Sequence, residues 1–178
     1  SRELKKIGGA FIQAESELGA INMAYGASAA GGRVLITSSS PGIALMQESI
    51  GLLCSVELPV VIINVMRGGP GIGSIQPSQQ DYLQAAKASG NGGFQMRVFA
   101  PSTVQEVTDM TYRAFDYADE DRNPVLILAD GVIGTMMEPV ELPPMLSDER
   151  IAEIKASKRS WACVGHKPGV EPLSWIEP

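Results

Sequence analysis

Short apolar runs alternate with segments of helical periodicity along the chain. The apolar runs lie at residues 10–13, 33–38, 58–66, 97–101 and 124–130, and the helical segments at 16–30, 42–56, 81–89 and 103–118. Strands that alternate with helices are typical of βαβ units and a parallel sheet. The runs at 58–66 and 125–128 are continuously apolar, as expected for strands covered by helices on both faces. The pattern predicts an α/β fold, a three-layer α/β/α sandwich with a mostly parallel sheet.

The two ends of the chain differ from this regular pattern. Residues 1–9, "SRELKKIGG", are typical of the last turn of an amphipathic helix that Gly8 and Gly9 stop, so we expect the N-terminal strand of a βαβ unit to be missing. The segment after 143 is rich in proline and charge and contains one polar helix candidate at 147–159. We expect an α/β domain over 1–143, and a linker or the start of a following domain over 144–178.

Composition narrows the class of protein. At 178 residues and 44% hydrophobic, the chain can fill one globular core. Its 14 basic and 20 acidic residues give a net charge of -6 without a basic cluster, so we expect no nucleic-acid partner. No apolar run is long enough for a membrane helix and no signal-peptide pattern opens the chain, so we expect no membrane association. We expect a cytoplasmic protein in which Cys54 and Cys163 stay reduced.

Few residue types remain for chemistry. His166 is the only histidine, and neither cysteine has a second ligand at metal-binding spacing, so we expect no metal site on this chain. Ser–His and Cys–His catalysis are equally unsupported. Any reaction must depend on carboxylates, arginine, backbone groups or a bound cofactor.

Polar and glycine-rich residues follow the predicted strands, at the edge where parallel sheets bind ligands. They are Glu15 and Glu17, "SSSPG" at 38–42, "RGGPGIG" at 67–73, "PST" at 101–103 and "DG" at 130–131. The N–H groups of the helix after "SSSPG" could bind an anion or a polar ligand. No nucleotide motif of the GxGxxG or GxxxxGK[ST] type is present. On these residues alone, Glu17 could equally be a helix-start carboxylate and "RGGPGIG" a surface loop.

The stretch "QAESELGAINMAYGASAAGGRVLITSSSPGIALMQESIGLL", followed by "LPVVIINVMRGGPGIG", resembles a known family. It is similar to the pyrimidine-binding domain in the alpha subunit of thiamine-diphosphate-dependent 2-oxoacid:ferredoxin oxidoreductases, and most similar to the 2-oxoisovalerate type. The resemblance covers about residues 11–143. It implies oxidative decarboxylation of a 2-oxoacid to an acyl-CoA, with only part of the active site on this chain.

The resemblance also implies roles for individual residues. In this family a glutamate hydrogen-bonds N1′ of the cofactor's aminopyrimidine and promotes the proton transfer that activates the thiazolium C2. Glu17 is the matching position, and Glu15 is its less certain neighbour. Arg67 matches the arginine that holds the substrate carboxylate, for which a planar guanidinium is well suited. Ser40 and Gly42, at the start of the following helix, are expected to contact the cofactor.

An absent motif implies partner subunits. Thiamine enzymes hold Mg²⁺ and the diphosphate with GDG followed by Asn, but here "ADG" at 129–131 lies after the last asparagine, Asn123. The resemblance places that motif, with Mg²⁺, on a beta subunit, and coenzyme A and iron–sulfur clusters on partner subunits including gamma and delta. We expect ferredoxin as the electron acceptor and a homodimer in isolation. A transketolase-type or decarboxylase-type pyrimidine domain and a non-catalytic assembly module are the alternatives.

Overall fold

The structure, a computed structural model, describes residues 2–87 and 90–165. It contains one four-stranded sheet in the order β1-β2-β4-β3, and all neighbouring strands are parallel. The strands are β1 (Leu35–Ser38), β2 (Val61–Met66), β3 (Arg97–Phe99) and β4 (Val125–Asp130). The predicted parallel α/β class is confirmed.

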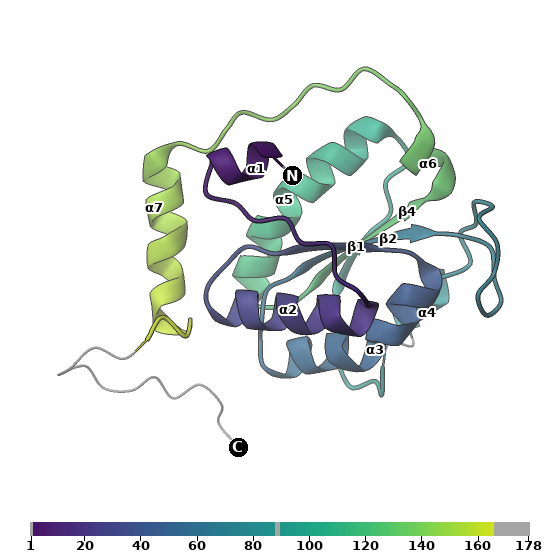
Figure 1. The fold of residues 1–178 in the computed structure, drawn as a ribbon, viewed down its shortest axis with the longest axis horizontal. Coiled ribbons are helices and arrows are strands. Elements are labelled where there is room, and N and C mark those ends of the chain that lie inside the picture. Colours follow the sequence, from purple (N-terminus) through teal and green to yellow (C-terminus); the bar gives the residue numbers. More distant parts are fainter. Residues whose placement is uncertain (1, 88–89, 166–178) are drawn as a thin grey trace.

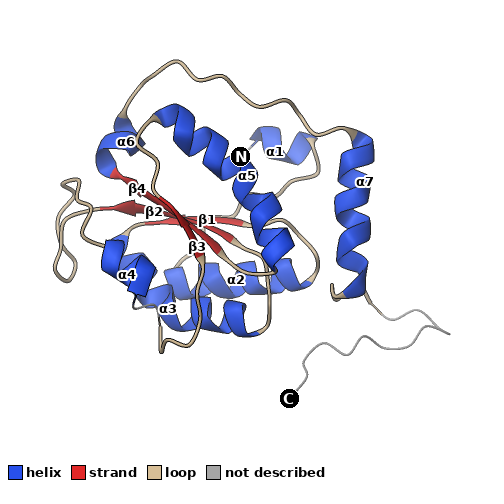
Figure 2. Ribbon diagram, turned by 180° about the vertical axis from the view of Figure 1, so that it is seen from behind, coloured by secondary structure: helices blue, strands red, loops and turns tan. Residues whose placement is uncertain are grey.

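Helices cover the sheet on both faces (Figure 1). The helical elements of the described residues are α1 (Arg2–Lys6), α2 (Glu17–Ala29), α3 (Ser40–Ser55), α4 (Tyr82–Lys87), α5 (Val104–Asp121), α6 (Gly131–Thr135), α7 (Asp148–Ser157) and the 3-10 turn η1 (Lys158–Ser160). Helices α2 and α3 lie on one face, and α5 lies on the other (Figure 2). The three-layer arrangement follows from this placement.

Two apolar clusters correspond to the two faces. The larger one packs α2 and α3 on the sheet and includes the fully buried side chains of Ile21, Met46 and Ile62. The smaller one joins Ala114 of α5 to Ile127 of β4. Residues 125–128 of β4 alternate between these clusters, and all six residues of the strand are buried. This explains why the strand is continuously apolar in sequence.

Three predicted elements need correction. Residues 10–13 form no strand, and Phe11 and Ile12 are 61% and 68% exposed, because no neighbouring strand or helix covers this short run. Helix α3 begins at Ser40, two residues before the predicted start. Helix α5 begins at Val104, where the Thr103 hydroxyl caps it by accepting from the Glu106 N–H, and it extends to Asp121, three residues past the predicted end. Of the helix predicted at 81–89, α4 is present, and residues 88–89 lie outside the described part of the chain.

The predicted end of the first helix is confirmed. Gly8 has a φ of +76°, and the N–H of Gly9 donates to the Leu4 carbonyl at 2.8 Å. This bond, with the one from Gly8 to Lys5 at 3.3 Å, forms a left-handed helix cap that favours glycine.

The segment after α7 packs against the main domain. Trp161 and Ala162 belong to the larger apolar cluster, and the Cys163 N–H donates to the Ala29 carbonyl at 2.7 Å. Lys158 is 3% exposed and forms an ion pair with Asp119 of α5 at 2.7 Å. Residues 166–178, including His166, lie outside the described residues. None of the described helices has the length and apolarity to cross a bilayer.

Candidate functional site

The N-termini of α2 and α3 and the loop after β2 meet at the carboxyl end of the sheet (Figure 1). Between them lies an open cavity of about 600 Å³. Its lining residues come from α2, β1, α3, β2 and the loop, and they are Glu17, Thr37, Ser38, Ser39, Pro41, Gly42, Leu45, Val65, Arg67 and Ile72. Three of the four predicted site residues, Glu17, Gly42 and Arg67, therefore share one cavity.

Glu17 is the first residue of α2 and is half-buried. The helix begins here because the Ser16 hydroxyl caps it, accepting from the Gly19 N–H at 3.1 Å. The Glu17 carboxylate forms no hydrogen bond or ion pair with any residue in the described ranges, so it is available to a ligand. Glu15, its less certain alternative, is exposed and does not line the cavity.

Gly42 gives Glu17 the room that it needs. A Cβ at position 42 would lie 2.7 Å from Glu17 Cγ and 3.0 Å from Glu17 Oε1, and it would also collide with the Ser38 hydroxyl. Atoms this close cannot coexist without movement, so any side chain at 42 would displace Glu17. The glycine therefore keeps α2 and α3 close together at the mouth of the cavity.

The N-terminus of α3 offers few free donors. Pro41 has no N–H, and the Gly42 N–H already donates to the Ser39 carbonyl at 2.7 Å. The predicted binding of an anion by these backbone groups receives little support from this geometry. The hydroxyl groups of Ser38 and Ser39 and the Glu17 carboxylate are the polar groups on this side of the cavity.

Arg67 follows β2 directly and brings the only cationic side chain to the cavity lining. Its Nε is buried without a hydrogen-bond partner, and its guanidinium forms no ion pair with a carboxylate among residues 2–87 and 90–165. A buried donor without a partner is costly, and a charged one more so. This geometry therefore suits an anion that enters the cavity, and a carboxylate matches the guanidinium fork.

Ser40 does not line the cavity, although it was predicted to contact the cofactor. Its Oγ accepts from the Arg67 N–H at 3.0 Å and donates to Asp81 Oδ2 at 2.5 Å. The same Asp81 oxygen accepts from Asn64 Nδ2 at 2.8 Å. The hydrogen bonds of Asp81 with Ser40 and Asn64 were not predicted, because no local motif indicates a contact between residues so far apart in the chain. Cofactor binding by Ser40 stays a prediction, and its hydroxyl is already bonded within the protein.

The loop from 67 to 81 is anchored at its far end to β4. Gln79 donates to Asp130 Oδ2 at 2.9 Å, and Asp130 Oδ1 caps α6 by accepting from the N–H groups of Val132 and Ile133. The Gln79 hydrogen bond, followed by those of the helix N–H groups, lowers the pKa of the Asp130 carboxyl. At its tip, Ile72 and Ile75 are 84% and 88% exposed.

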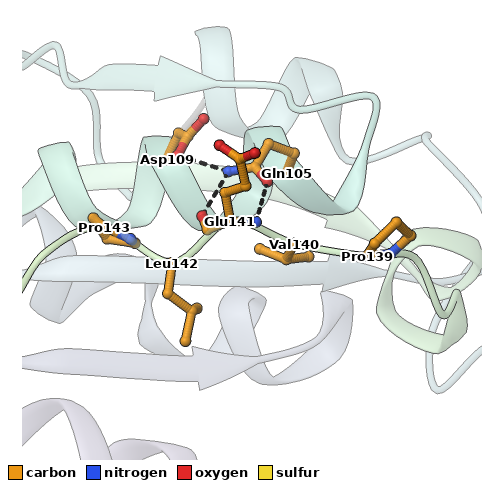
Figure 3. Close-up of a pocket in the computed structure, with 7 residues that line it drawn as sticks. All are labelled: Gln105, Asp109, Pro139, Val140, Glu141, Leu142 and Pro143. Atoms are coloured by element: carbon orange, nitrogen blue, oxygen red, sulfur yellow. Dashed lines mark hydrogen bonds between the residues drawn. The ribbon is translucent and has the colours of Figure 1, made fainter.

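A second open cavity of about 600 Å³ lies between α5 and the connection that follows α6 (Figure 3). The side-chain amide of Gln105 bonds the backbone of Glu141 twice, donating to its carbonyl at 3.0 Å and accepting from its N–H at 2.8 Å. The same amide also donates to Asp109 at 3.0 Å. These hydrogen bonds engage the Gln105 amide and hold the connection that follows α6 against α5.

Other chemistry receives no support from the described residues. Burial raises the pKa of the Cys54 thiol to about 12, which makes it a poor nucleophile. Within 2–87 and 90–165, no three histidine, cysteine or acidic side chains lie close enough together to hold a metal ion. The carboxylate and guanidinium of the first cavity are thus the reactive groups that the described structure brings together.

Comparison with known proteins shows one consistent relationship. The sequence profile of the family described as "Pyruvate flavodoxin/ferredoxin oxidoreductase, thiamine diP-bdg" matches residues 1–168. The ketoisovalerate oxidoreductase subunit VorB of Methanothermobacter thermautotrophicus is 48% identical over 173 residues, which is 97% of this chain and 47% of the relative. The 2-oxoglutarate synthase subunit KorA of Methanocaldococcus jannaschii is 40% identical over 80% of this chain and 39% of its own length.

A solved structure is also similar. The 2-oxoglutarate:ferredoxin oxidoreductase from Magnetococcus marinus, with 2-oxoglutarate, coenzyme A and succinyl-CoA bound, matches with a TM-score of 0.71 and 34% identity. The match covers 74% of this chain and 23% of that one. The chain thus spans about half the length of the VorB relative and less of the others.

Proposed function

The chain belongs to the thiamine-diphosphate-binding family of pyruvate flavodoxin/ferredoxin oxidoreductases, and from this premise we propose that it is the pyrimidine-binding part of a 2-oxoacid:ferredoxin oxidoreductase alpha subunit. The reaction is the oxidative decarboxylation of a 2-oxoacid to its acyl-CoA. The observation that carries the proposal is the cavity in which an unpartnered carboxylate, Glu17, and an unpartnered guanidinium, Arg67, occur together.

The residues of the cavity fit the pyrimidine end of thiamine diphosphate. Glu17 projects from a helix start, and the missing side chain at Gly42 leaves room for it at the mouth of the cavity. When bound, this cofactor supplies a nucleophilic thiazolium carbon and an electron sink for decarboxylation. The Glu17 carboxylate would hold a hydrogen bond at N1′ of the aminopyrimidine and exchange the proton there. General acid–base groups of this kind contribute roughly 10²–10⁴-fold to a rate.

Arg67 would bind the carboxylate of the 2-oxoacid. The fork geometry of its guanidinium allows two parallel hydrogen bonds to one carboxylate, which fixes orientation as well as position. The apolar lining residues Leu45, Val65 and Ile72 favour an aliphatic side chain on the substrate. Because Arg67 is the only cation that the described residues bring to the lining, none of them offers a partner to a second substrate carboxylate there. Together with the VorB similarity, this favours 2-oxoisovalerate over 2-oxoglutarate.

The remaining parts of the enzyme would come from other chains. We assign the diphosphate and Mg²⁺ to a beta subunit and the coenzyme A and iron–sulfur sites to partners that include gamma and delta subunits, with ferredoxin accepting the electrons. The isolated chain should form a homodimer and bind thiamine diphosphate weakly. The free thiols of Cys54 and Cys163 fit a reducing compartment, and we place the enzyme in the cytoplasm.

Steady-state kinetics of the complete enzyme test the proposal. Glu17→Gln should lower kcat for 2-oxoisovalerate by about 10²–10⁴-fold, because glutamine keeps the shape but cannot exchange the proton. Glu15→Gln is the matched control, since this neighbouring carboxylate is exposed and outside the cavity lining. Equal activities of the two variants would refute the catalytic role of Glu17.

A further inference from the structure

Asp81 connects three elements beneath the candidate site. It directly precedes α4, and its backbone carbonyl accepts the Ala85 N–H of that helix at 3.0 Å. Its Oδ2 accepts from Ser40, the first residue of α3, at 2.5 Å and from Asn64 of β2 at 2.8 Å. One carboxylate oxygen therefore links the returning end of the 67–81 loop to the helix and the strand that border the cavity.

The connection continues to Arg67 through Ser40. The Ser40 Oγ accepts from the Arg67 N–H at 3.0 Å. Because the Ser40 proton is directed to Asp81, a lone pair of its oxygen is left to accept from Arg67. Asp81 thus orients the hydroxyl group that accepts from the Arg67 N–H at the end of β2.

No other described group can take over the role of Asp81. Asn64 is 1% exposed, and its Oδ1 already has no hydrogen-bond partner. Without Asp81, the Nδ2 group of Asn64 would lose its hydrogen-bond acceptor as well, and a buried amide cannot turn to water. The amide would have to rearrange, and Ser40 would be free to donate to the Arg67 carbonyl, which lies 3.4 Å away.

We propose that Asp81 is a positioning residue for substrate binding: through Ser40 it fixes the backbone of Arg67 so that this half-buried side chain directs its guanidinium into the cavity. This inference rests on the proposed function of Arg67 as the carboxylate-binding residue. Misplacing a binding group by about 1 Å can cost up to about 10²-fold, so a displaced arginine should reduce substrate binding measurably. Asp81 itself does not line the cavity and touches no substrate in this account.

The test is steady-state kinetics of the complete enzyme with 2-oxoisovalerate as the varied substrate. Asp81→Ala should raise KM by about 10-fold while kcat at saturation changes by less than about 3-fold. Ser40→Ala should raise KM similarly. Asp81→Asn should stay within about 3-fold of the parent enzyme, because one amide oxygen can accept both hydrogen bonds. Asp148→Ala, which removes an exposed carboxylate on the distant helix α7, is the control for charge and should have no effect.

A double variant separates positioning from general damage. Arg67→Ala should raise KM by itself, and adding Asp81→Ala to it should raise KM no further, because Asp81 acts through Arg67. A fall in melting temperature or in active fraction with an unchanged KM would show that Asp81 is only structural. The proposal would also be overturned if the KM of Asp81→Asn rose as much as that of Asp81→Ala. If Arg67→Ala leaves KM unchanged, the proposed function of Arg67 fails instead.

Discussion

The side chain of Glu17 lies against the backbone of Gly42, so closely that a methyl group at position 42 would come within 2.7 Å of Glu17 Cγ. Glu17 is the first residue of α2 and Gly42 lies in the first turn of α3, and the two helices pack side by side on the sheet. The contact places an ionisable group at the carboxyl end of the sheet, where parallel α/β proteins bind their ligands.

Gly42→Ala should therefore destabilise the protein although alanine favours helices. The added methyl would overpack the contact with Glu17 and Ser38, at a cost of about 1–3 kcal/mol. The matched control is Gly26→Ala in α2, where an added Cβ meets no atom within 4 Å and should stabilise the helix by about 0.5–1 kcal/mol. Urea unfolding of the two variants gives the comparison. Equal stability would contradict the close approach of Glu17 to Gly42.

The buried ion pair of Lys158 and Asp119 predicts that removing the carboxylate destabilises the protein more than removing the ammonium group. Asp119 also pairs with Arg33 at 2.8 Å, so Lys158→Met leaves the carboxylate with a partner. Asp119→Ala instead leaves the ammonium of a lysine that is 3% exposed without its carboxylate, which costs about 3–5 kcal/mol. Chemical denaturation should show Asp119→Ala as clearly the less stable variant. The account of this network is wrong if Lys158→Met is equally or more destabilised.

The lowered pKa of Asp130 predicts that the folded state loses part of its stability in acid. Its pKa is lowered below the ordinary value of 3.8, chiefly by the Gln79 hydrogen bond, so the folded state binds a proton less readily than the unfolded state. The stabilisation is complete above the unfolded pKa and is lost as the pH falls through the folded pKa.

Asp130→Asn removes this titration, because asparagine can still cap α6 but carries no charge. Unfolding free energies measured from pH 7 down to pH 2 should differ most between parent and variant at neutral pH, and the difference should shrink as the pH falls below about 4. A difference that does not change over this range would exclude a lowered pKa of Asp130.

Local patterns predicted most of the fold. The runs at 58–66 and 124–130 became the central strands because they are apolar on both faces, and both faces are covered. The run at 10–13 failed as a strand because apolar residues alone do not specify a pairing partner. Helix α6 was missed because its five residues are too few to show a helical period.

The candidate site was predicted in part. Glu17, Gly42 and Arg67 could be found because they lie within the family motifs, Glu17 and Gly42 in the first turns of helices and Arg67 directly after a strand. Asp81 could not, since its hydrogen bonds reach Ser40 and Asn64 across 41 and 17 positions of sequence. Such contacts depend on how the loop from 67 to 81 returns to the sheet, and no periodicity in the sequence encodes that path.

The exchange of the thiazolium C2 proton of bound thiamine diphosphate tests the central claim most directly, because it measures cofactor activation without the later steps of turnover. In the complete enzyme, NMR should show the exchange slowed by about 10²–10⁴-fold in Glu17→Gln, with the cofactor still bound and stability changed by less than about 1 kcal/mol. Exchange at the parent rate in Glu17→Gln would show that Glu17 is only the first carboxylate of a helix.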